Sequence, residues 1–205
     1  MQERTERRSN RDRTETTRAQ LIAAARRLFA EKSYAETSTP EIVAAAGVTR
    51  GALYHHFTDK QALFRAVAEE EAATVAAEIE HAAPEALDAR QALMSGSRAY
   101  LEAMQAPGRT RLLLLDGPAV LGRAGMDEID ARHGNRTLRE GLAIAMRLGA
   151  MKKLPLSALT GQLAAAFDRA ALAIDAGADA GEQLEVISAV IDGLIVPANA
   201  GPATA

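Results

Sequence analysis

The stretch GVTRGALYHHF, residues 47–57, combines residue types that suit contact with a nucleic acid. Thr49 stands where a helix can begin, and the free backbone N–H groups at a helix start attract phosphate. Arg50 carries a forked guanidinium that can donate paired hydrogen bonds to a guanine edge or to a phosphate. Gly51 has no side chain, so the backbone of this helix can approach a groove closely. Tyr54 and His55 follow one turn later, on or near the same face.

The segments before this stretch contain the elements that would position it. Ser38 and Glu41 form a capping box with Pro40 in the first turn, which predicts a short helix that ends at Gly47. An earlier helix over about 17–32 presents apolar residues at helical spacing. These are Leu21, Ala25, Leu28 and Phe29.

A fourth helix is predicted directly after the stretch. Thr58 and Gln61 form a second capping-box pattern, and the helix runs to about His81. Lys60, in its first turn, can place an ammonium against a nucleic-acid backbone. Two short helices joined by a glycine turn, after a longer helix, are typical of a helix-turn-helix. In that motif the second short helix enters the DNA major groove with its N-terminal residues leading.

The composition favours an all-α protein. Hydrophobic residues make up 48% of the 205 residues and aromatic residues 3%, so the apolar content is mostly Ala and Leu, which are strong helix formers. The absence of cysteine excludes disulfides, thiolate zinc sites and cysteine nucleophiles. No apolar run approaches the roughly 20 residues that span a bilayer, and the charged N-terminus is no secretory signal, so we expect a cytoplasmic protein without membrane contact.

Charge is divided unevenly along the chain. Residues 1–60 hold 11 Lys/Arg and 8 Asp/Glu, whereas the remainder holds 13 and 19. A weakly basic head on an acidic body fits a nucleic-acid-binding protein. Residues 1–16 lack apolar periodicity and are predicted to be a disordered tail. The alternative is a basic arm that touches DNA, because five arginines are dense there: Arg4, Arg7, Arg8, Arg11 and Arg13.

The segment TSTPEIVAAAGVTRGALYHHFTDKQALF, residues 37–64, resembles the DNA-binding head of the TetR (tetracycline repressor) family of bacterial regulators. The AGV turn, the Tyr-x-x-Phe pair and the following Asp-Lys-x-x-Leu-Phe carry the resemblance. Two positions depart from the family pattern. Ser33 stands where the family commonly has glycine, and Val43 stands where alanine is usual.

The resemblance implies DNA contacts of two kinds. Phosphate contacts are implied for Ser38, Thr49, Tyr54 and Lys60, and base or phosphate contacts for Arg50, Gly51 and His55. For His56 a contact and a solvated helix end are about equally good explanations. The apolar members of the motif are expected to face inward, namely Ala52, Leu53 and Phe57.

Beyond Pro84 the glycine and proline positions predict helices near 86–106, 110–121, 127–150, 156–176 and 181–195. The expected fold is an N-terminal three-helix head with a helix-turn-helix, followed by a C-terminal helical body. We divide the chain into a tail (1–16), a DNA-binding domain (17–64), a ligand-binding and dimerisation domain (65–196) and a flexible tail (197–205).

The resemblance implies that the body forms a homodimer, and two apolar stripes support this prediction. Their residues are Leu159, Leu163, Phe167, Ala170 and Ile174 in one stripe, and Leu184, Ile187 and Ile191 in the other. The alternative is that both stripes lie in the core of a single chain. We prefer the dimer because a helix-turn-helix gains affinity from two half-sites about 34 Å apart, or a multiple of it, on a pseudo-palindromic double-stranded operator.

The resemblance also implies that the body binds a small-molecule effector, whose identity the sequence does not reveal. A ligand that prefers one arrangement of the two heads would release the DNA, which describes a repressor, although activation stays open. Candidate ligand contacts are Ser97, Tyr100, Met104, Leu113, Met126 and His133. For each of them an ordinary core or surface position is the alternative. We expect no cofactor and no enzymatic activity.

Three rival functions find less support in the sequence. Glu78 with His81 and Asp130 with His133 have the spacing of a helical di-iron bundle, but matching glutamates on apolar faces are lacking. A hydrolase would need a nucleophile motif or a convincing triad, and neither is present. A DNA-coating protein would need a much more basic chain than a pI near 5.9 indicates.

Overall fold

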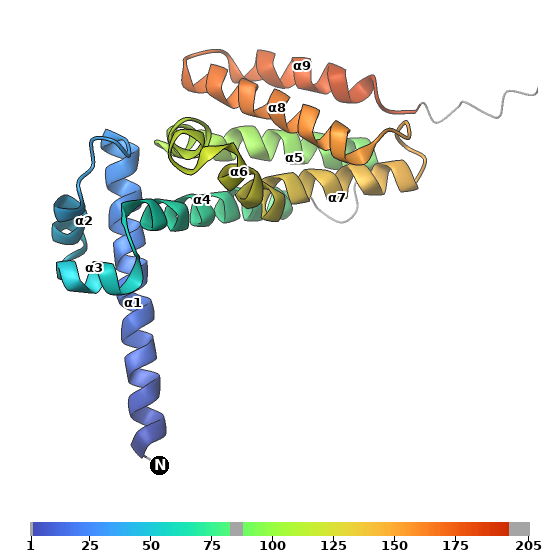
Figure 1. Cartoon of the computed structure of the whole chain (residues 1–205). Coiled ribbons are helices and arrows are strands. Elements are labelled where there is room, and N and C mark those ends of the chain that lie inside the picture. Colours follow the sequence, from blue (N-terminus) through green and yellow to red (C-terminus); the bar gives the residue numbers. More distant parts are fainter. Residues whose placement is uncertain (1, 83–87, 197–205) are drawn as a thin grey trace, which may run out of the picture. The chain divides into compact units, whose positions relative to one another are not determined.

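The computed structural model describes residues 2–82 and 88–196, and the side chains of 13–82 and 88–196. Apart from an isolated bridge between Met151 and Ile195, these residues form helices and turns (Figure 1), which confirms the all-α prediction. No described helix combines the length and apolar character that crossing a bilayer requires. The elements are α1 (Gln2–Lys32), α2 (Thr39–Ala46), α3 (Arg50–His56), α4 (Lys60–Ala82), α5 (Ala89–Met104), the π-helical turn η1 (Arg111–Asp116), α6 (Gly117–Arg132), α7 (Gly134–Arg147), α8 (Leu156–Asp175) and α9 (Ala180–Asp192).

The chain divides into two compact units. The head unit comprises Met1–Glu71 with Arg111–Met126, and the body unit comprises Ala72–Thr110 with Asp127–Ala205. Both α4 and α6 contribute residues to each unit. The predicted domains assigned 111–126 to the body, so this segment is the main difference between the two divisions. The predicted C-terminal tail, 197–205, lies outside the described residues.

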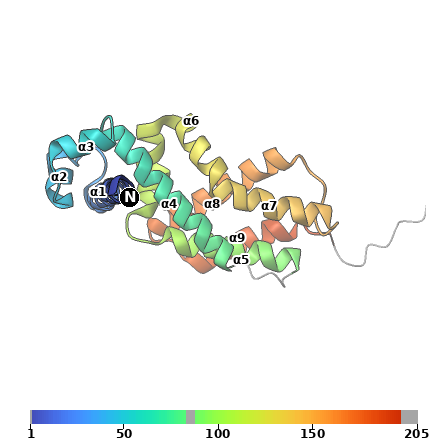
Figure 2. The same ribbon diagram turned by 90° about the horizontal axis from the view of Figure 1, so that it is seen from below.

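Apolar side chains of the three head helices meet beside α1. Figure 2 looks nearly along α1 and shows α2 and α3 on one side of it. Leu21 and Phe29 of α1, Ile42 of α2 and Leu53 of α3 are fully buried. Burial of each such side chain contributes about 1.5–3 kcal/mol. The apolar face predicted for the first helix therefore holds the helix-turn-helix.

The two predicted N-caps of the helix-turn-helix are confirmed. The Ser38 hydroxyl accepts a hydrogen bond from the N–H of Glu41, whose carboxylate accepts from the N–H of Ser38 at 2.8 Å. The helix α2 ends at Gly47, where φ is 66°, a left-handed conformation that favours glycine. The Thr49 hydroxyl accepts from the N–H of Ala52 at 3.1 Å and so begins α3.

The predicted cap of α4 is wrong by one residue. Asp59, not Thr58, accepts a hydrogen bond from the N–H of Ala62, at 2.7 Å, and α4 begins directly after it. The side chain of Gln61 does not return to the cap but donates to the carbonyl of Val120 at 2.6 Å. Hydroxyls and carboxylates cap helices about equally well, so the sequence alone left two adjacent positions open.

The first helix begins much earlier than the sequence predicts. The helix α1 starts at Gln2, whereas the pattern predicted a disordered tail over 1–16 and a helix from about 17. The added segment has no proline or glycine and is rich in Arg and Glu, which have good helix propensity. A helix that packing has already nucleated extends at little cost. The side chains before residue 13 lie outside the described part, and with them four of the five arginines of the predicted basic arm; the fifth, Arg13, is exposed.

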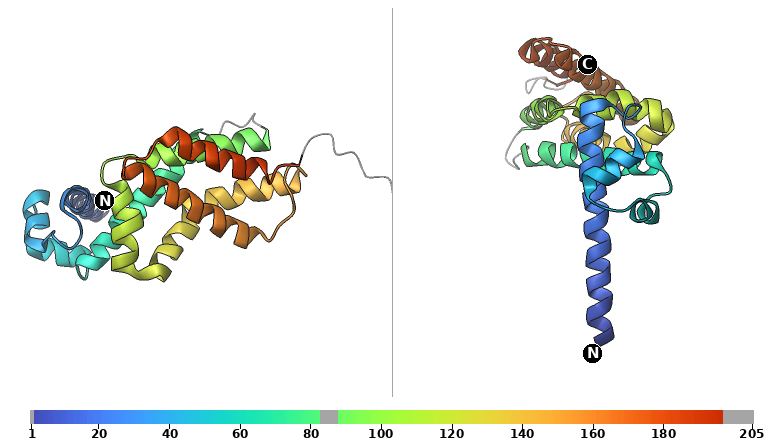
Figure 3. Two further views of the ribbon diagram at one scale, coloured as in Figure 1. Left: turned by 90° about the horizontal axis from the view of Figure 1, so that it is seen from above. Right: turned by 90° about the vertical axis from the view of Figure 1, so that its left-hand side faces the viewer.

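In the body unit α5 packs on α7, α8 and α9, and α8 lies beside α9 (Figure 3). One predicted boundary in the second half of the chain is confirmed, and another is wrong. Within α6 the backbone leaves helical geometry at Gly122, where φ is 71° and ψ is 166°, as the glycines at 122–125 predicted. Glycine adopts a positive φ readily because it has no side chain, so the predicted boundary coincides with the kink inside α6. In contrast, the chain breaks at His133, inside the predicted helix 127–150.

Candidate nucleic-acid interface

One side of α3 is exposed because its opposite side is anchored. Leu53 is fully buried and Phe57, directly after the helix, is 6% exposed, as the sequence predicted for the inward side. The remaining side carries four exposed residues that we call the α3 face. They are Arg50, Gly51, Tyr54 and His55.

The first turn of the α3 face carries its strongest donor. The Arg50 guanidinium lies over the ring of Tyr54, 5.5 Å from the ring centroid. Such a cation–π contact orients a guanidinium while its N–H groups stay available to a ligand. A Cβ atom added at Gly51 would meet only the Thr49 hydroxyl, at 3.9 Å, so no protein contact requires glycine there. The space beside Gly51 therefore suits a close approach of another molecule.

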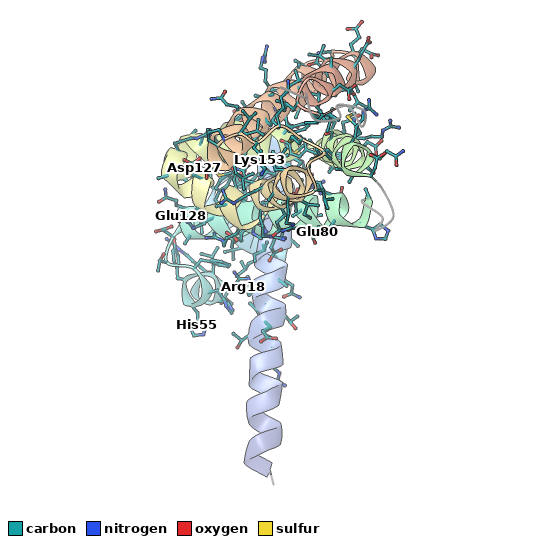
Figure 4. All side chains as sticks on the ribbon, turned by 90° about the vertical axis from the view of Figure 1, so that its right-hand side faces the viewer. Arg18, His55, Glu80, Asp127, Glu128 and Lys153 are labelled. Atoms are coloured by element: carbon teal, nitrogen blue, oxygen red, sulfur yellow. The ribbon has the colours of Figure 1, made fainter. Side chains whose placement is uncertain are left out.

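Cationic and titratable groups gather at the C-terminal end of α3. His55 projects away from the helix (Figure 4), and its ring centroid lies 5.3 Å from that of His56. Burial, and then the charges of His55 and Arg18, lower the pKa of His56. Arg18 reaches from α1 over the ring of Phe57, 5.4 Å from the centroid, and its guanidinium is 3.8 Å from the Glu70 carboxylate. Arg18 is not among the predicted contacts. It lies one helical turn before the buried Leu21 of α1, and this spacing is the signal in the sequence that could have identified it.

The start of α2 places an exposed hydroxyl beside a buttressed carboxylate. Ser38 donates to Glu41 at 2.8 Å, and the Lys32 ammonium donates to the same carboxylate at 2.7 Å. The hydrogen bond from Lys32, followed by those from Ser38, lowers the pKa of Glu41 from 4.5 to about 2. The ionised carboxylate therefore keeps Ser38 in its capping position.

Lys60 has a different environment from the other predicted DNA contacts. Its ammonium donates to the carbonyls of Tyr34 and Thr37, each at 2.9 Å, and lies 4.0 Å from the centroid of the Tyr34 ring. Burial lowers the pKa of Lys60. The structure thus brings five predicted contacts together on or beside α3 and one at the start of α2, whereas the Lys60 ammonium is engaged within the protein.

The predicted ligand contacts are divided between the two units. Leu113 and Met126 are buried in the head unit, whereas the other four belong to the body unit. In the head, a Cβ atom added at Gly117 would lie 2.8 Å from the sulfur of Met126, so this part is closely packed. In the body, the Ser97 hydroxyl donates to the carbonyl of Leu93, one turn earlier, at 2.7 Å.

A polar pair lies in the interior of the body unit. The Tyr100 hydroxyl donates to the Asp168 carboxylate at 2.8 Å, and its ring packs edge-on against Phe167 with centroids 5.7 Å apart. Burial, and then the Asp168 charge, raise the pKa of Tyr100 well above its ordinary value. Met104 is 2% exposed, and His133 stands at the break before α7. Tyr100 is therefore the predicted ligand residue with the most distinctive environment.

Most of the predicted dimer residues lie in the core of one chain. Five of the eight are buried, and three are half-buried, namely Leu159, Ile174 and Leu184. Their apolar stripes face the neighbouring helices of the same body unit, because α8 and α9 pack on each other and on α5. The alternative prediction, that the stripes lie in the core of a single chain, therefore describes the five buried residues. They are Leu163, Phe167, Ala170, Ile187 and Ile191.

The di-iron hypothesis finds no support among the described residues. Glu78 pairs with the Arg109 guanidinium at 3.3 Å, and no three His, Asp or Glu side chains of the described part lie together as a metal site would require.

The fold and the exposed α3 face define a class of protein, the helix-turn-helix transcriptional regulators. Two family models match the chain: bacterial regulatory proteins of the tetR family over residues 21–67, and the tetracyclin repressor-like C-terminal domain over residues 90–197. The chain belongs to the TetR family, and its relatives are named as transcriptional repressors or regulators.

Individual relatives agree with this assignment. The transcriptional repressor AcnR of Corynebacterium efficiens is 42% identical over 65 residues, which cover 32% of this chain and 35% of AcnR. The chain thus matches about a third of the length of such curated relatives. A TetR-family regulator from Pectobacterium atrosepticum is 33% identical, with 91% of this chain and 97% of that chain covered and a TM-score of 0.71.

More distant structures share the fold. The regulator LfrR of Mycobacterium smegmatis, solved with proflavine, is 21% identical with a TM-score of 0.62, and the superposition covers 89% of this chain and 97% of that one. RolR, solved with resorcinol, is 20% identical with a TM-score of 0.69, and the superposition covers 88% of this chain and 87% of RolR.

Proposed function

We propose that this protein is a homodimeric repressor that binds a specific DNA operator and releases it when a small molecule binds the body. The α3 face is the observation that carries this proposal, because it exposes a guanidinium, a tyrosine and a histidine on a helix anchored from behind. The relatives named as repressors support the direction of regulation.

The proposed DNA contacts follow from exposure. Thr49 and Ser38 would meet phosphate at the starts of α3 and α2, where backbone N–H groups also point outward. Arg50 would read a base edge or bind phosphate, and Gly51 would permit the approach. Tyr54 and His55 would contact the backbone or bases one turn further along.

Binding is tested by fluorescence anisotropy on DNA from immediately upstream of the gene, with a scrambled duplex as control and a stated salt concentration. A duplex selected from a random library serves if the operator lies elsewhere. We expect tight binding to one duplex only. Arg50→Ala should weaken specific binding by about 1–3 kcal/mol while the oligomeric state is unchanged. Equal affinity of the variant for the operator would remove Arg50 from the site.

We further propose that the dimer forms through the exposed sides of α8 and α9 rather than through the buried stripes. On α9, Val186 is 64% exposed and Val190 48% exposed, one turn apart. The exposed side of α8 is rich in small residues that permit close helix packing, namely Ala158, Gly161, Ala165 and Ala166. The partially buried Leu159, Ile174 and Leu184 would line the edge of this interface.

The dimer is tested by sedimentation of Val186→Glu/Val190→Glu. Two carboxylates in an apolar interface carry a desolvation cost, so we expect monomers with an unchanged helical spectrum. Leu148→Glu is the matched control, since Leu148 is 70% exposed on the residue after α7. A dimer that survives the double substitution would contradict this interface.

For the effector we propose an aromatic molecule bound in the body. The solved relatives hold resorcinol and proflavine, and the body contains the aromatic and polar groups of Tyr100, Phe167 and Asp168. Ser97, Met104 and His133 of the body remain proposed contacts, whereas Leu113 and Met126 belong to the head unit and are not part of this proposal. Resorcinol and proflavine are the first probes: a compound that binds should raise the melting temperature and lower operator affinity together.

A further inference from the structure

The connection between α1 and α2 is held by charged side chains from two different segments. The N–H of Tyr34 donates to the Asp116 carboxylate at 2.9 Å, and the carbonyl of Tyr34 accepts from the Lys60 ammonium at 2.9 Å. Asp116 is the last residue of η1, and Lys60 is the first residue of α4. The peptide groups on both sides of one residue are therefore fixed by a carboxylate and an ammonium, all within the head unit.

The ammonium of Lys60 is committed to this connection. Two of its three N–H donors are used by the carbonyls of Tyr34 and Thr37, and the Tyr34 ring faces the charge from 4.0 Å. Charged donors make the stronger class of hydrogen bond. A phosphate contact would have to compete with these three interactions.

The connection between α1 and α2, residues 33–38, contains an unfavourable backbone conformation, so contacts from other segments can stabilise it. Ser33 adopts φ 87°, a left-handed conformation that is unfavourable for a residue with a side chain. The buried Thr37 hydroxyl donates back to the carbonyl of Ser33 at 2.8 Å. The next residue, Ser38, is the N-cap of α2. Any displacement at Tyr34 is therefore passed within four residues to the start of the helix-turn-helix.

A second bond ties the same two segments together. Gln61, next to Lys60, donates to the carbonyl of Val120, four residues after Asp116. The segment of η1 and early α6 is thus joined to the connection by Asp116 and to α4 by Gln61. Irregular π-helical turns often mark functional positions in helices, and this one ends at the residue that holds Tyr34.

We propose that Lys60 and Asp116 are positioning residues for DNA binding: together they clamp the peptide groups of Tyr34 and so place α2 and α3, and Lys60 makes no phosphate contact. The inference rests on the proposed DNA-binding function. It gives Lys60 a role different from the one that the family resemblance implies. It also makes Asp116 a residue through which a change in η1 reaches the DNA site.

The salt dependence of DNA binding separates a clamp from a phosphate contact. Each phosphate that a protein neutralises contributes about 0.9 to the slope of log Kobs against log salt concentration. Lys60→Met keeps the length of the side chain and removes the ammonium. With a mixed-sequence duplex and the selected duplex, between about 50 and 200 mM salt, we expect affinity about tenfold lower at every salt concentration and an unchanged slope.

Three further variants complete the experiment. Asp116→Ala should lower affinity to a similar extent, and the double variant with Lys60→Met should be less than additive, because both residues act on Tyr34. Lys153 is an exposed lysine of the body (Figure 4), and Lys153→Met is the matched control. It should change neither the affinity for DNA nor the salt slope. Thermal denaturation of each variant establishes that it is folded at the assay temperature.

Two outcomes overturn the inference while wild-type binding stands. A slope that becomes shallower by about 0.9 for each Lys60 removed identifies a phosphate contact. A lower melting temperature with unchanged affinity and slope identifies a purely structural lysine. A wild-type protein that binds neither duplex contradicts the proposed function itself, and the positioning role with it.

Discussion

The head and the body of this protein use the same helical building blocks but leave different kinds of residue exposed. In the head, Leu53 and Phe57 are buried and the polar residues between them face outward. In the body, the apolar residues expected to meet a partner, such as Phe167 and Ile191, are buried in the same chain. A polar residue that contacts DNA can be recognised in the sequence because it interrupts the apolar pattern of a helix. An apolar residue that contacts a partner chain cannot, because it has the same residue type and spacing as the residues of the core.

The largest effect is expected from the aromatic core of the head. Phe64 is fully buried, with ring centroids 5.3 Å from Phe29 and 5.1 Å from Tyr34. Phe64→Ala should lower the free energy of unfolding by about 3–5 kcal/mol in urea titrations, through lost burial and a cavity.

The matched variant in the head is Tyr54→Ala on the α3 face. Tyr54 is 45% exposed, so its loss should change stability by less than about 0.5 kcal/mol while weakening DNA binding. A strongly destabilised Tyr54→Ala would break the distinction between the core of the head and its exposed face.

A smaller effect is expected from the polar pair in the body. Tyr100→Phe removes the hydroxyl that donates to Asp168 and should lower the free energy of unfolding by about 1–2 kcal/mol. Chemical denaturation measures this change, and Tyr54→Phe is the control. Unchanged stability combined with an altered response to an effector would instead assign the Tyr100 hydroxyl to ligand binding.

The pH dependence of head stability should reveal the ionised cap of α2. The folded-state pKa of Glu41, about 2, lies below its unfolded value of 4.5. Its contribution is therefore present above about pH 4.5 and is lost as the pH falls toward 2. Glu41→Gln should remove this part of the acid transition in melting curves. Lys32→Met should shift the loss of this stabilisation to higher pH, because it removes the hydrogen bond that lowers the pKa of Glu41 most. If neither variant changed the dependence of the melting temperature on pH, the stabilising role of ionised Glu41 would be contradicted.

The smallest effect is expected at the two left-handed positions that flank α2. Ser33→Gly should stabilise the protein by less than about 1 kcal/mol, because relief of the strain at φ 87° is partly offset by the entropy of glycine. Gly47→Ala at φ 66° should have the opposite sign, by about 1 kcal/mol. Destabilisation by Ser33→Gly would show that the bond from the N–H of Glu36 to the Ser33 hydroxyl outweighs the strain.

Local patterns predicted the helix-turn-helix because each of its boundaries has its own chemical signal. The Ser38 capping box, the left-handed Gly47 and the Thr49 cap all lie within a few residues of the backbone groups they satisfy. Where two adjacent residues could serve equally, as at Thr58 and Asp59, the prediction was wrong by one position. Where the signal was only the absence of apolar periodicity, as over 1–16, the sequence could not separate a solvated helix from a disordered tail.

The sequence by itself determined the helical class, the helix-turn-helix and the identity of the residues on α3, because helix caps and apolar periodicity act over three or four residues. The tertiary structure alone decided which apolar stripes of α8 and α9 are buried, that the chain breaks at His133, and what the Lys60 ammonium binds. Those outcomes depend on contacts between residues far apart in the chain, such as Tyr34 with Asp116, and no local spacing records them.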